Sequence, residues 1–481
     1  MNARLNARLQ APSHSPSARW ALVALSLSML LSSLGTSIAN VGLPTLSQAF
    51  GASFQEVQWI VLAYLLTITS LIVSAGRLGD VIGRRRLLLG GLFLFTLASL
   101  LCGVAPTLGW LIGARAAQGL GAAVMMALTM ALVGDAMPKD RTGSAMGLLG
   151  TTSAVGTALG PSLGGVLTAT FGWPALFLVN LPLGAAAFVL AYRHLPADRA
   201  APKTSRAGFD VAGTTLLALT LAAYALAMTR HGPFGFITVI LLLVAAIGTA
   251  LFIRVEASAP APLVRLAFFR DPALRAGLMM SGLVATVIMA TFVVGPFYLA
   301  QGLGLDAVHV GLVMSVGPFV AALTGVPAGR IVDRFGAGRV TMIGLSSLAA
   351  GCLLLYLLPA RLGIPGYLGS LIVCTLGYAL FQTANNTAVM TDLAPDRRGV
   401  ISGLLSLSRN LGLVTGASVM GAVFAFTSAT VDVTTARPET VATGLHATFA
   451  VATVLILIAL ALAGVSRARA PRPMPEAEPG E

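Results

Sequence analysis

The sequence predicts an all-helical protein that crosses a membrane fourteen times. Of the 481 residues, 56% are hydrophobic and only 10% are charged, whereas soluble domains carry about 25% charged residues. One membrane-spanning helix takes about 20 mostly apolar residues. The apolar residues together with the 53 Gly therefore suffice for about fourteen such helices. A soluble fold, a disordered chain and a coiled coil are excluded.

Short polar or basic segments separate the apolar ones and locate the expected helices along the chain. The expected spans are 20–44, 55–75, 87–105, 108–132, 143–168, 174–192, 209–229, 234–253, 276–300, 308–328, 340–359, 365–389, 399–426 and 442–465. The segment that precedes the first span is polar and basic, and the first apolar run is too long for a cleaved signal peptide.

The net charge of +13 is a topology signal and not the footprint of a nucleic acid. With the N-terminus in the cytoplasm, 25 of the 30 Lys and Arg residues fall on the cytoplasmic side. Arg115 and Arg409 fall inside spans. Because cytoplasmic loops carry the excess of Lys and Arg, we expect both termini in the cytoplasm, an even number of spans and no nucleic-acid partner.

Two internal echoes indicate that the chain contains two related halves. Residues 76–84 recur at 329–336 with an offset of 253, and residues 141–149 recur at 397–405 with an offset of 256. Duplicated halves are common among transporters. The expected organisation is an N-terminal tail, a six-helix bundle, linkers around two extra helices (209–229 and 234–253), a second six-helix bundle and a C-terminal tail, at 1–19, 20–193, 194–275, 276–465 and 466–481.

Several motifs resemble those of the major facilitator superfamily, in particular its fourteen-helix drug:proton antiporter family. The sequence GRLGDVIGRRR at 76–86 is similar to the signature of the superfamily. Further similar stretches lie in order along the first six spans, at 36–44, 58–64, 115–119, 156–165 and 177–182. The resemblance implies a major facilitator fold, with two six-helix bundles and two extra central helices.

The loop at 76–86 is the expected gate. Gly76, Gly79 and Gly83 permit a tight turn, and Asp80 lies among four arginines, including Arg84. The resemblance implies that Asp80 helps to lock the two halves together, and Asp333 occupies its place in the second copy. The alternative is that the arginines only set topology.

Arg115 is a charge inside an apolar run, which is costly, so it should face the bundle interior or water. In the family the matching arginine is linked to proton transfer. The alternative is that it binds a backbone carbonyl or Gln118.

Gly156, Gly160 and Gly164 recur every fourth residue and form one face of the fifth span, and Pro161 removes a helix hydrogen bond there. The resemblance implies an antiporter-type bend that seals against leak. The alternative is ordinary packing. The positions aligned with Gly160 and Pro161 in the second half are Gly416 and Ala417, so no proline bend is expected there.

Polar residues inside the spans are candidates for a substrate cavity, although each could instead bind a neighbouring helix. In the first half they are Asn40, Tyr64, Gln118 and Asn180, and in the second half Gln382, Asn385, Asn386, Arg409 and Asn410.

No carboxylate lies deep in a span, and this is a departure from the family. Relatives often carry an aspartate just before the Thr36 position, where this chain has Gly35. We therefore expect neutral or anionic substrates in preference to polycations. Proton coupling would have to use Asp80, Asp210, another group at the edge of the membrane, or a proton carried with the substrate.

The sequence thus predicts a secondary active exporter of small amphiphilic compounds, either drugs or self-made toxic metabolites, in the bacterial inner membrane. It would use a proton gradient and no cofactor or metal, and act as a monomer in the lipid bilayer, with a periplasmic adaptor as a candidate partner in a Gram-negative cell. The alternative is an importer or facilitator of a small nutrient. An enzyme is not expected, because the five His are scattered and no metal-binding spacing of Cys and His occurs.

Overall fold

The computed structural model describes residues 16–136, 142–198, 210–229, 236–259, 270–358, 360–390, 395–428 and 437–469. These residues are helical, without strands in the described ranges. The expected tails and parts of the two expected linkers lie outside them.

The N-terminal bundle contains seven helical segments. They are α2 (Pro16–Phe50), α3 (Phe54–Ile82), α4 (Arg84–Gly103), α5 (Leu108–Ala136), α6 (Thr142–Phe171), α7 (Ala175–Leu178) and α8 (Asn180–His194). The single span expected at 174–192 is interrupted between α7 and α8. Pro182 lacks the N–H that would bond the carbonyl of Leu178 there.

Two central helices follow, α9 (Val211–Thr229) and α10 (Phe236–Ser258). The C-terminal bundle then consists of α11 (Pro272–Phe297), η2 (Tyr298–Gly302), α12 (Ala307–Phe335), α13 (Ala337–Tyr356), η3 (Ala360–Leu362), α14 (Gly363–Met390), α15 (Pro395–Thr415), η4 (Gly416–Met420), α16 (Gly421–Thr427) and α17 (Pro438–Arg469). Here η2 and η4 are π-helical turns and η3 is a 3₁₀ turn.

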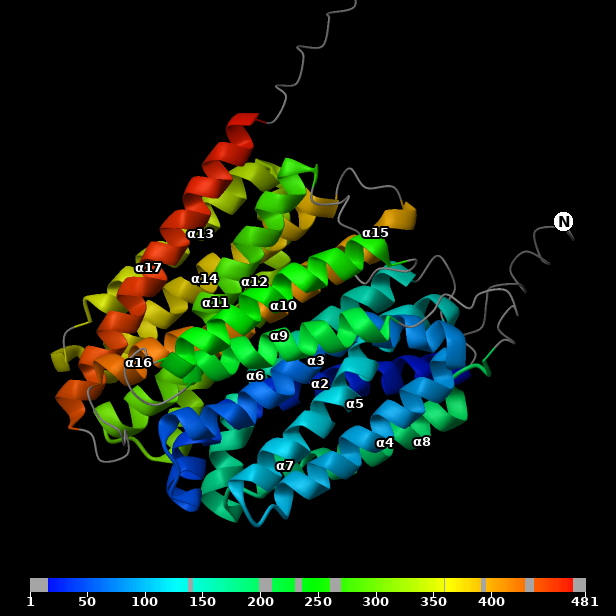
Figure 1. Cartoon of the computed structure of the whole chain (residues 1–481), viewed down its shortest axis with the longest axis horizontal. Coiled ribbons are helices and arrows are strands. Elements are labelled where there is room, and N and C mark those ends of the chain that lie inside the picture. The colour runs from blue at the N-terminus through cyan, green and yellow to red at the C-terminus, as the bar shows by residue number, and fades with distance from the viewer. Residues whose placement is uncertain are drawn as a thin grey trace, which may run out of the picture.

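Thirteen helical stretches in the described ranges are long and apolar enough to cross a membrane. The 30-residue α6 lies beside them, packed against both α2 and α12. The fourteen-helix fold expected from the sequence is confirmed. Figure 1 shows the helices running side by side, with α9 and α10 between the two bundles.

The turn at 76–86 is shorter than the sequence suggested. Helix α3 continues to Ile82 and α4 begins at Arg84, so only Gly83 forms the turn, with φ of 108°. Its counterpart Gly336 joins α12 to α13 with φ of 81°. Gly79 serves a different purpose, because a side chain there would collide with Leu128 of α5.

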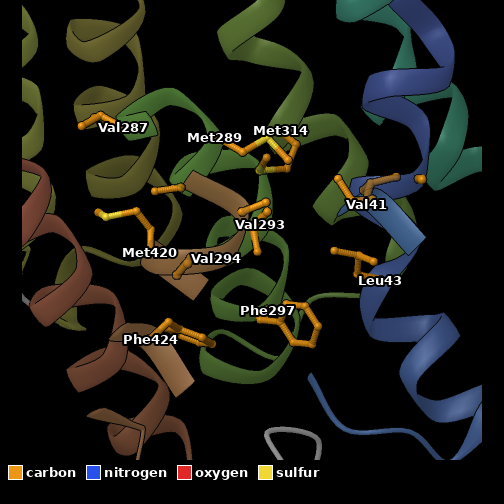
Figure 2. Close-up of a cluster of buried hydrophobic side chains, with 14 of the residues drawn as sticks. Val41, Leu43, Val287, Met289, Val293, Val294, Phe297, Met314, Met420 and Phe424 are labelled. Carbon is orange, nitrogen blue, oxygen red and sulfur yellow. The ribbon is translucent and has the colours of Figure 1, made fainter. Parts of the chain in front are cut away.

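The two ends of the molecule differ in how the bundles meet. At the end that carries Phe54, the "Phe54 end", one hydrophobic core contains residues of both bundles. Figure 2 shows Val41 and Leu43 of α2 in this core, together with Phe297 of α11, Met314 of α12 and C-terminal bundle residues such as Met420 and Phe424. At the opposite end, the "Gly83 end", the described cores lie within separate bundles. The bundles are therefore sealed together at the Phe54 end.

Candidate functional site

The glycine face of α6 is packed against α2. A methyl group on Gly156 would lie 2.8 Å from the carbonyl oxygen of Leu30, and one on Gly160 would lie 2.7 Å from Cβ of Ser37. One on Gly164 would lie 2.7 Å from Cγ1 of Val41. Such distances leave no room for a side chain, so the three glycines let the two helix backbones approach closely.

The C-terminal bundle repeats this contact between α11 and α15. A methyl group on Gly412 would lie 2.7 Å from Cβ of Ala285, and one on Gly416 would lie 2.6 Å from Cβ of Met289. The alignment of Gly160 with Gly416 therefore also holds in space. Ala417, which is aligned with Pro161, lies in the π-helical turn η4. The second bundle thus has its own irregularity in place of the missing proline.

The two bundles meet at the Phe54 end through a pair of equivalent contacts. In the first, α6 touches α12: a methyl group on Gly311 would lie 2.5 Å from the carbonyl oxygen of Pro161 and 2.9 Å from Cα of Gly165. In the second, Nε2 of Gln58 in α3 donates a hydrogen bond of 3.0 Å to the carbonyl oxygen of Ala417.

These two contacts are related by the internal repeat. The offset of 253 carries Gln58 onto Gly311, and the offset of 256 carries Pro161 and Gly165 onto Ala417 and Gly421. Gly421 leaves the space that Gln58 occupies, since a methyl group there would lie 2.9 Å from Cδ of Gln58. One contact is glycine on glycine, and the other is an amide against glycine.

An aromatic cluster completes the seal. The ring of Phe54 lies 4.6 Å from that of Phe297 and 5.3 Å from that of Phe424, measured between centroids. Phe54 belongs to α3, and its two partners belong to α11 and α16. Aromatic pairs at such distances contribute roughly 0.5–1.5 kcal/mol beyond their buried area. This cluster holds the Phe54 end closed.

Arg115 of α5 is fully buried inside the N-terminal bundle. Its Nε donates 2.9 Å to the carbonyl oxygen of Ile60, and its Nη2 donates 3.1 Å to that of Gly35. Nη1 donates to Oε1 of Gln118, and the guanidinium carbon lies 4.2 Å from the centroid of the Tyr64 ring. Backbone carbonyls, an amide and an aromatic face therefore stabilise this charge.

Three predicted site residues thus form one buried cluster. Gln118 donates 2.7 Å to the hydroxyl of Ser99, and the Tyr64 hydroxyl donates 2.8 Å to the carbonyl oxygen of Ser32. Arg115, Gln118 and Tyr64 are each 0% exposed. A methyl group on Gly35 would point at the Tyr64 hydroxyl, 2.9 Å away, so an aspartate at this position would enter the same cluster.

Arg409 of α15 lies between two contact faces of its helix. On this helix Ser408, Gly412 and Gly416 face α11, whereas Ala417 and Gly421 face Gln58 of α3. Since each helical residue turns by about 100°, Arg409 lies on the face between these two directions.

The opposite face of the same segment is covered by α9, where Tyr224 lies beside Thr415 and Ser418. Arg409 is half-buried, and its Nε has no hydrogen-bond partner in the described structure. Arg409 is therefore a half-buried cation on the face of α15 between its two contact faces, with one buried donor left unpaired.

The remaining cavity candidates behave differently from one another. Asn385 donates 3.2 Å to the carbonyl oxygen of Gly277 and so joins α14 to α11, while Gln382 and Asn386 are half-buried. Among the buried amides, Asn40 Oδ1, Asn410 Nδ2 and both amide atoms of Asn180 have no hydrogen-bond partner in the described structure. Unsatisfied buried amides are uncommon in proteins, so these four buried atoms have unused hydrogen-bonding capacity inside the bundles.

Acidic candidates lie near helix ends. Asp80 is in the last turn of α3, and its side chain lies outside the described part of the structure. Arg84 opens α4, and Asp333 is exposed near the end of α12.

Asp210 caps α9, accepting 2.7 Å from the N–H of Gly213. A methyl group on Gly213 would also lie 2.7 Å from Oε1 of Glu256, so two carboxylates meet there. Glu256 is buried near the end of α10.

Sequence reasoning missed two of the residues that organise these regions. Asp198 caps α4, because its carboxylate accepts from the N–H groups of Arg85 (2.8 Å) and Arg86 (3.1 Å). Asp198 lies far from α4 along the chain, so no pattern in the sequence indicated that it caps this helix. Gln58 was part of a motif but had no assigned role. Its alignment with Gly311 by the 253 offset is the signal that could have revealed it.

At the Phe54 end, Ser53 caps α3 and Asp306 caps the equivalent helix α12. Asp306 accepts 2.9 Å from the N–H of His309, and this bond holds the pKa of Asp306 below its ordinary value.

The described residues contain no group of three or more His, Cys, Asp or Glu that could hold a metal ion. The three cysteines are buried and free.

The model of the Major Facilitator Superfamily matches residues 25–417. The chain belongs to the Major Facilitator Superfamily. It is 30% identical over 408 residues to the riboflavin transporter RibZ of Clostridioides difficile (strain 630), which covers 84% of this chain and 88% of the relative. It is 33% identical over 418 residues to the multidrug resistance protein Stp of Mycobacterium tuberculosis (strain CDC 1551 / Oshkosh), which covers 85% and 77%.

Solved structures of major facilitator proteins share the fold. A mutant of the nucleoside transporter NupG superposes with a TM-score of 0.64 at 13% identity, covering 93% of this chain and 99% of that one. A bacterial homologue of the lysosomal transporter Spinster gives 0.64 at 16% identity, covering 94% and 98%. Membership of the superfamily, together with the thirteen apolar helices in the described ranges, makes the chain a multi-pass membrane transporter.

Proposed function

We propose that this transporter exports small amphiphilic compounds, neutral or anionic in preference to polycationic, by proton-coupled antiport and alternating access. The observation that carries the proposal is Arg409, a half-buried cation between the α11 and α3 contacts of its helix, whose buried Nε has no hydrogen-bond partner in the described structure. Arg115, the other charge inside the spans, is already held by its own bundle. A dicationic substrate would meet only repulsion from both.

Alternating access requires a seal that can open. The contacts at the Phe54 end join the bundles through two glycines, one hydrogen bond and three aromatic rings. The hydrogen bond and the ring contacts break when the bundles separate, without unfolding either bundle. We assign the Phe54 end to the outside and both termini to the cytoplasm of a bacterial inner membrane, because Lys and Arg accumulate at the Gly83 end.

For coupling to the proton gradient, the pair of Asp210 and Glu256 is our candidate alongside Asp80. Both carboxylates lie at the Gly83 end of the central helices, and α9 contacts both bundles. The hydroxyls of Ser74 and Thr214 lie 2.6 Å apart, and Nε1 of Trp59 donates 3.0 Å to the hydroxyl of Thr229. A change in charge at Asp210 could thus act on a helix fastened to α3 at both ends.

Transport into everted vesicles under a proton gradient tests the proposal. We expect accumulation of a monoanionic dye, and little of a dicationic dye of similar size. Arg409→Gln should lower accumulation of the anionic dye about tenfold, since charge-assisted contacts are the stronger ones. Arg361→Gln, an exposed arginine at the Phe54 end, is the control. Strong accumulation of the dication would contradict the charge preference.

Import is the alternative direction of transport, and one specific observation favours it. A relative at 30% identity is a riboflavin transporter, which favours an importer or facilitator of a nutrient as the second candidate. Accumulation of the anionic dye by right-side-out vesicles, with none by everted vesicles, would establish this alternative. We expect a monomer to carry out transport, with a periplasmic adaptor as a partner only in a Gram-negative cell.

A further inference from the structure

A groove of about 430 Å³ lies between α2 and α6 at the Gly83 end. Its walls are the stretch from Arg19 to Leu30 of α2 and, from α6, Leu148 and Thr152. The stretch of α2 is twelve residues long and rises about 16 Å from its first residue to its last. Half of a bilayer core measures about 15 Å. The groove therefore has the length of one acyl chain in one leaflet.

The direction of one hydroxyl explains why the groove is open. In the C-terminal bundle, Oγ of Ser408 donates 2.6 Å across to the carbonyl oxygen of Leu278, which joins α15 to α11. The equivalent residue of α6, by the 256 offset, is Thr152. Its hydroxyl donates 2.8 Å to the carbonyl oxygen of Leu148 in its own helix. The adjacent Ser153 does join α6 to α2, because its hydroxyl lies 2.7 Å from that of Ser33. In the described structure the two helices are therefore fastened just beyond Leu30, where the groove ends, and not along Leu148 and Thr152.

The groove opens towards lipid. Two faces of α6 are used, by Gly160 against α2 and by Gly165 against α12. A third, apolar face is exposed along the whole helix, from Leu148 through Leu159 to Val166. Because Val166 lies at the sealed Phe54 end, this face cannot line the central space and must contact the bilayer. Leu148, at the rim of the groove, is 46% exposed on the same face.

A positive charge stands at the mouth of the groove. Arg19 is exposed in the first turns of α2, next to Trp20, whose ring stacks on His194 with a centroid distance of 6.1 Å. Tryptophan gathers at the level of lipid headgroups. Inside the groove, Oγ of Ser26 is buried without a hydrogen-bond partner in the described structure, and the rest of the α2 wall is apolar.

We propose that this groove binds an anionic phospholipid, with one acyl chain along α2 and its phosphate on Arg19. Apolar walls of leaflet length, exposure to the bilayer and a cation at headgroup level together select this ligand. A zwitterionic lipid would enter the groove with the same acyl chain but gain less from Arg19. This site is separate from the central space and does not depend on the direction of transport.

Native mass spectrometry of the purified full chain tests the charge component, with phosphatidylglycerol and phosphatidylcholine of identical acyl chains as probes. Wild type should retain phosphatidylglycerol more strongly. Arg19→Gln should weaken that binding about fivefold. Arg275→Gln is the control, because Arg275 is an exposed arginine in the first turns of α11 and lies where Ser408 closes the helices. Equal losses in both variants would overturn the proposal.

Filling the groove tests the acyl-chain component. Ser26→Phe should reduce retention of both lipids. Arg275→Gln should leave the retention of both lipids unchanged. Leu148→Trp, at the rim, is a second variant that leaves the α2 wall intact and should act in the same direction. Each variant is first checked for an unchanged elution profile and melting curve in detergent. Unaltered retention of phosphatidylglycerol by either folded variant would overturn the proposal.

Discussion

The two bundles use the same close contact between equivalent helices. They differ on either side of this contact, towards the Gly83 end and towards the Phe54 end. In the N-terminal bundle, α2 and α6 touch through Gly156 and Gly160 and separate towards the Gly83 end. In the C-terminal bundle, α11 and α15 touch through Gly412 and Gly416 and stay joined there by Ser408.

At the Phe54 end, the cross-bundle partner of α6 is Gly311, while that of η4 is Gln58. The repeat therefore fixes where helices meet, and single side chains decide how each meeting behaves.

The largest expected effect comes from breaking the shared contact. Gly160→Leu and Gly416→Leu should each abolish or strongly lower the yield of folded protein. A side chain at either position meets the facing helix at distances that real side chains do not reach. Overpacking of a rigid core costs about 1–3 kcal/mol or more.

Gly90→Leu is the matched control for this comparison, because no atom lies within 4 Å of a methyl group at Gly90. Elution profiles and melting in detergent would measure the three variants. A Gly160→Leu protein that melts like the Gly90→Leu protein would contradict the close contact.

The second-largest effect tests each of the two cross-bundle contacts individually. Gln58→Ala removes the donor to the Ala417 carbonyl, and an unsatisfied buried group costs about 1–3 kcal/mol. The Phe54 end should then open more often. Spin labels at Thr107 and Arg361, one on each bundle, would report a longer distance population.

Gln48→Ala, at an exposed position of α2, should leave the distances unchanged. Gly311→Ala should lengthen them as well, because a methyl group wedges apart α6 and α12. Unchanged distances in both Gln58→Ala and Gly311→Ala would show that these contacts do not hold the seal.

A smaller effect distinguishes the two hydroxyls. Ser408→Ala loses a hydrogen bond between helices, worth roughly 0.6 kcal/mol in a membrane protein. Thr152→Ala loses only a bond within its own helix and should change the free energy of unfolding less. Unfolding by denaturing detergent would compare the two. A larger loss for Thr152→Ala would contradict the explanation given for the groove.

The smallest effect concerns the equivalent caps of α3 and α12. Ser53 and Glu56 cap α3, and the 253 offset carries them onto Asp306 and His309. Since the pKa of Asp306 is lowered by folding, its charge stabilises the protein above the ordinary pKa of aspartate. This stabilisation is lost as the pH falls through the lowered value.

Asp306→Asn should therefore melt slightly below wild type at neutral pH and equally at strongly acidic pH. A melting difference that grows on acidification would have the wrong sign for a carboxylate with a lowered pKa.

Much of the architecture could be predicted because it follows from patterns along the chain. Apolar length gave fourteen helices, the repeat related Gly83 to Gly336, and glycine spacing predicted the contact face of α6. Helix ends were less certain, as at Ile82, because the glycines before it and the arginines that open α4 have the composition of a loop. The carbonyls that bind Arg115 could not be identified for a different reason. Every residue has a backbone carbonyl, so the sequence does not distinguish that of Ile60 from the others.

The sequence by itself determined the number of spans, the duplicated halves and the scarcity of charge within the membrane. Hydrophobic length and helical period are local properties, so they can be read residue by residue. The tertiary structure decided that Arg115 is held inside one bundle while Arg409 lies on the face of α15 between its contacts with α11 and α3. It also decided that Thr152 bonds its own helix whereas Ser408 reaches its neighbour. Both outcomes depend on the direction of a side chain and on what lies opposite, which only packing in three dimensions specifies.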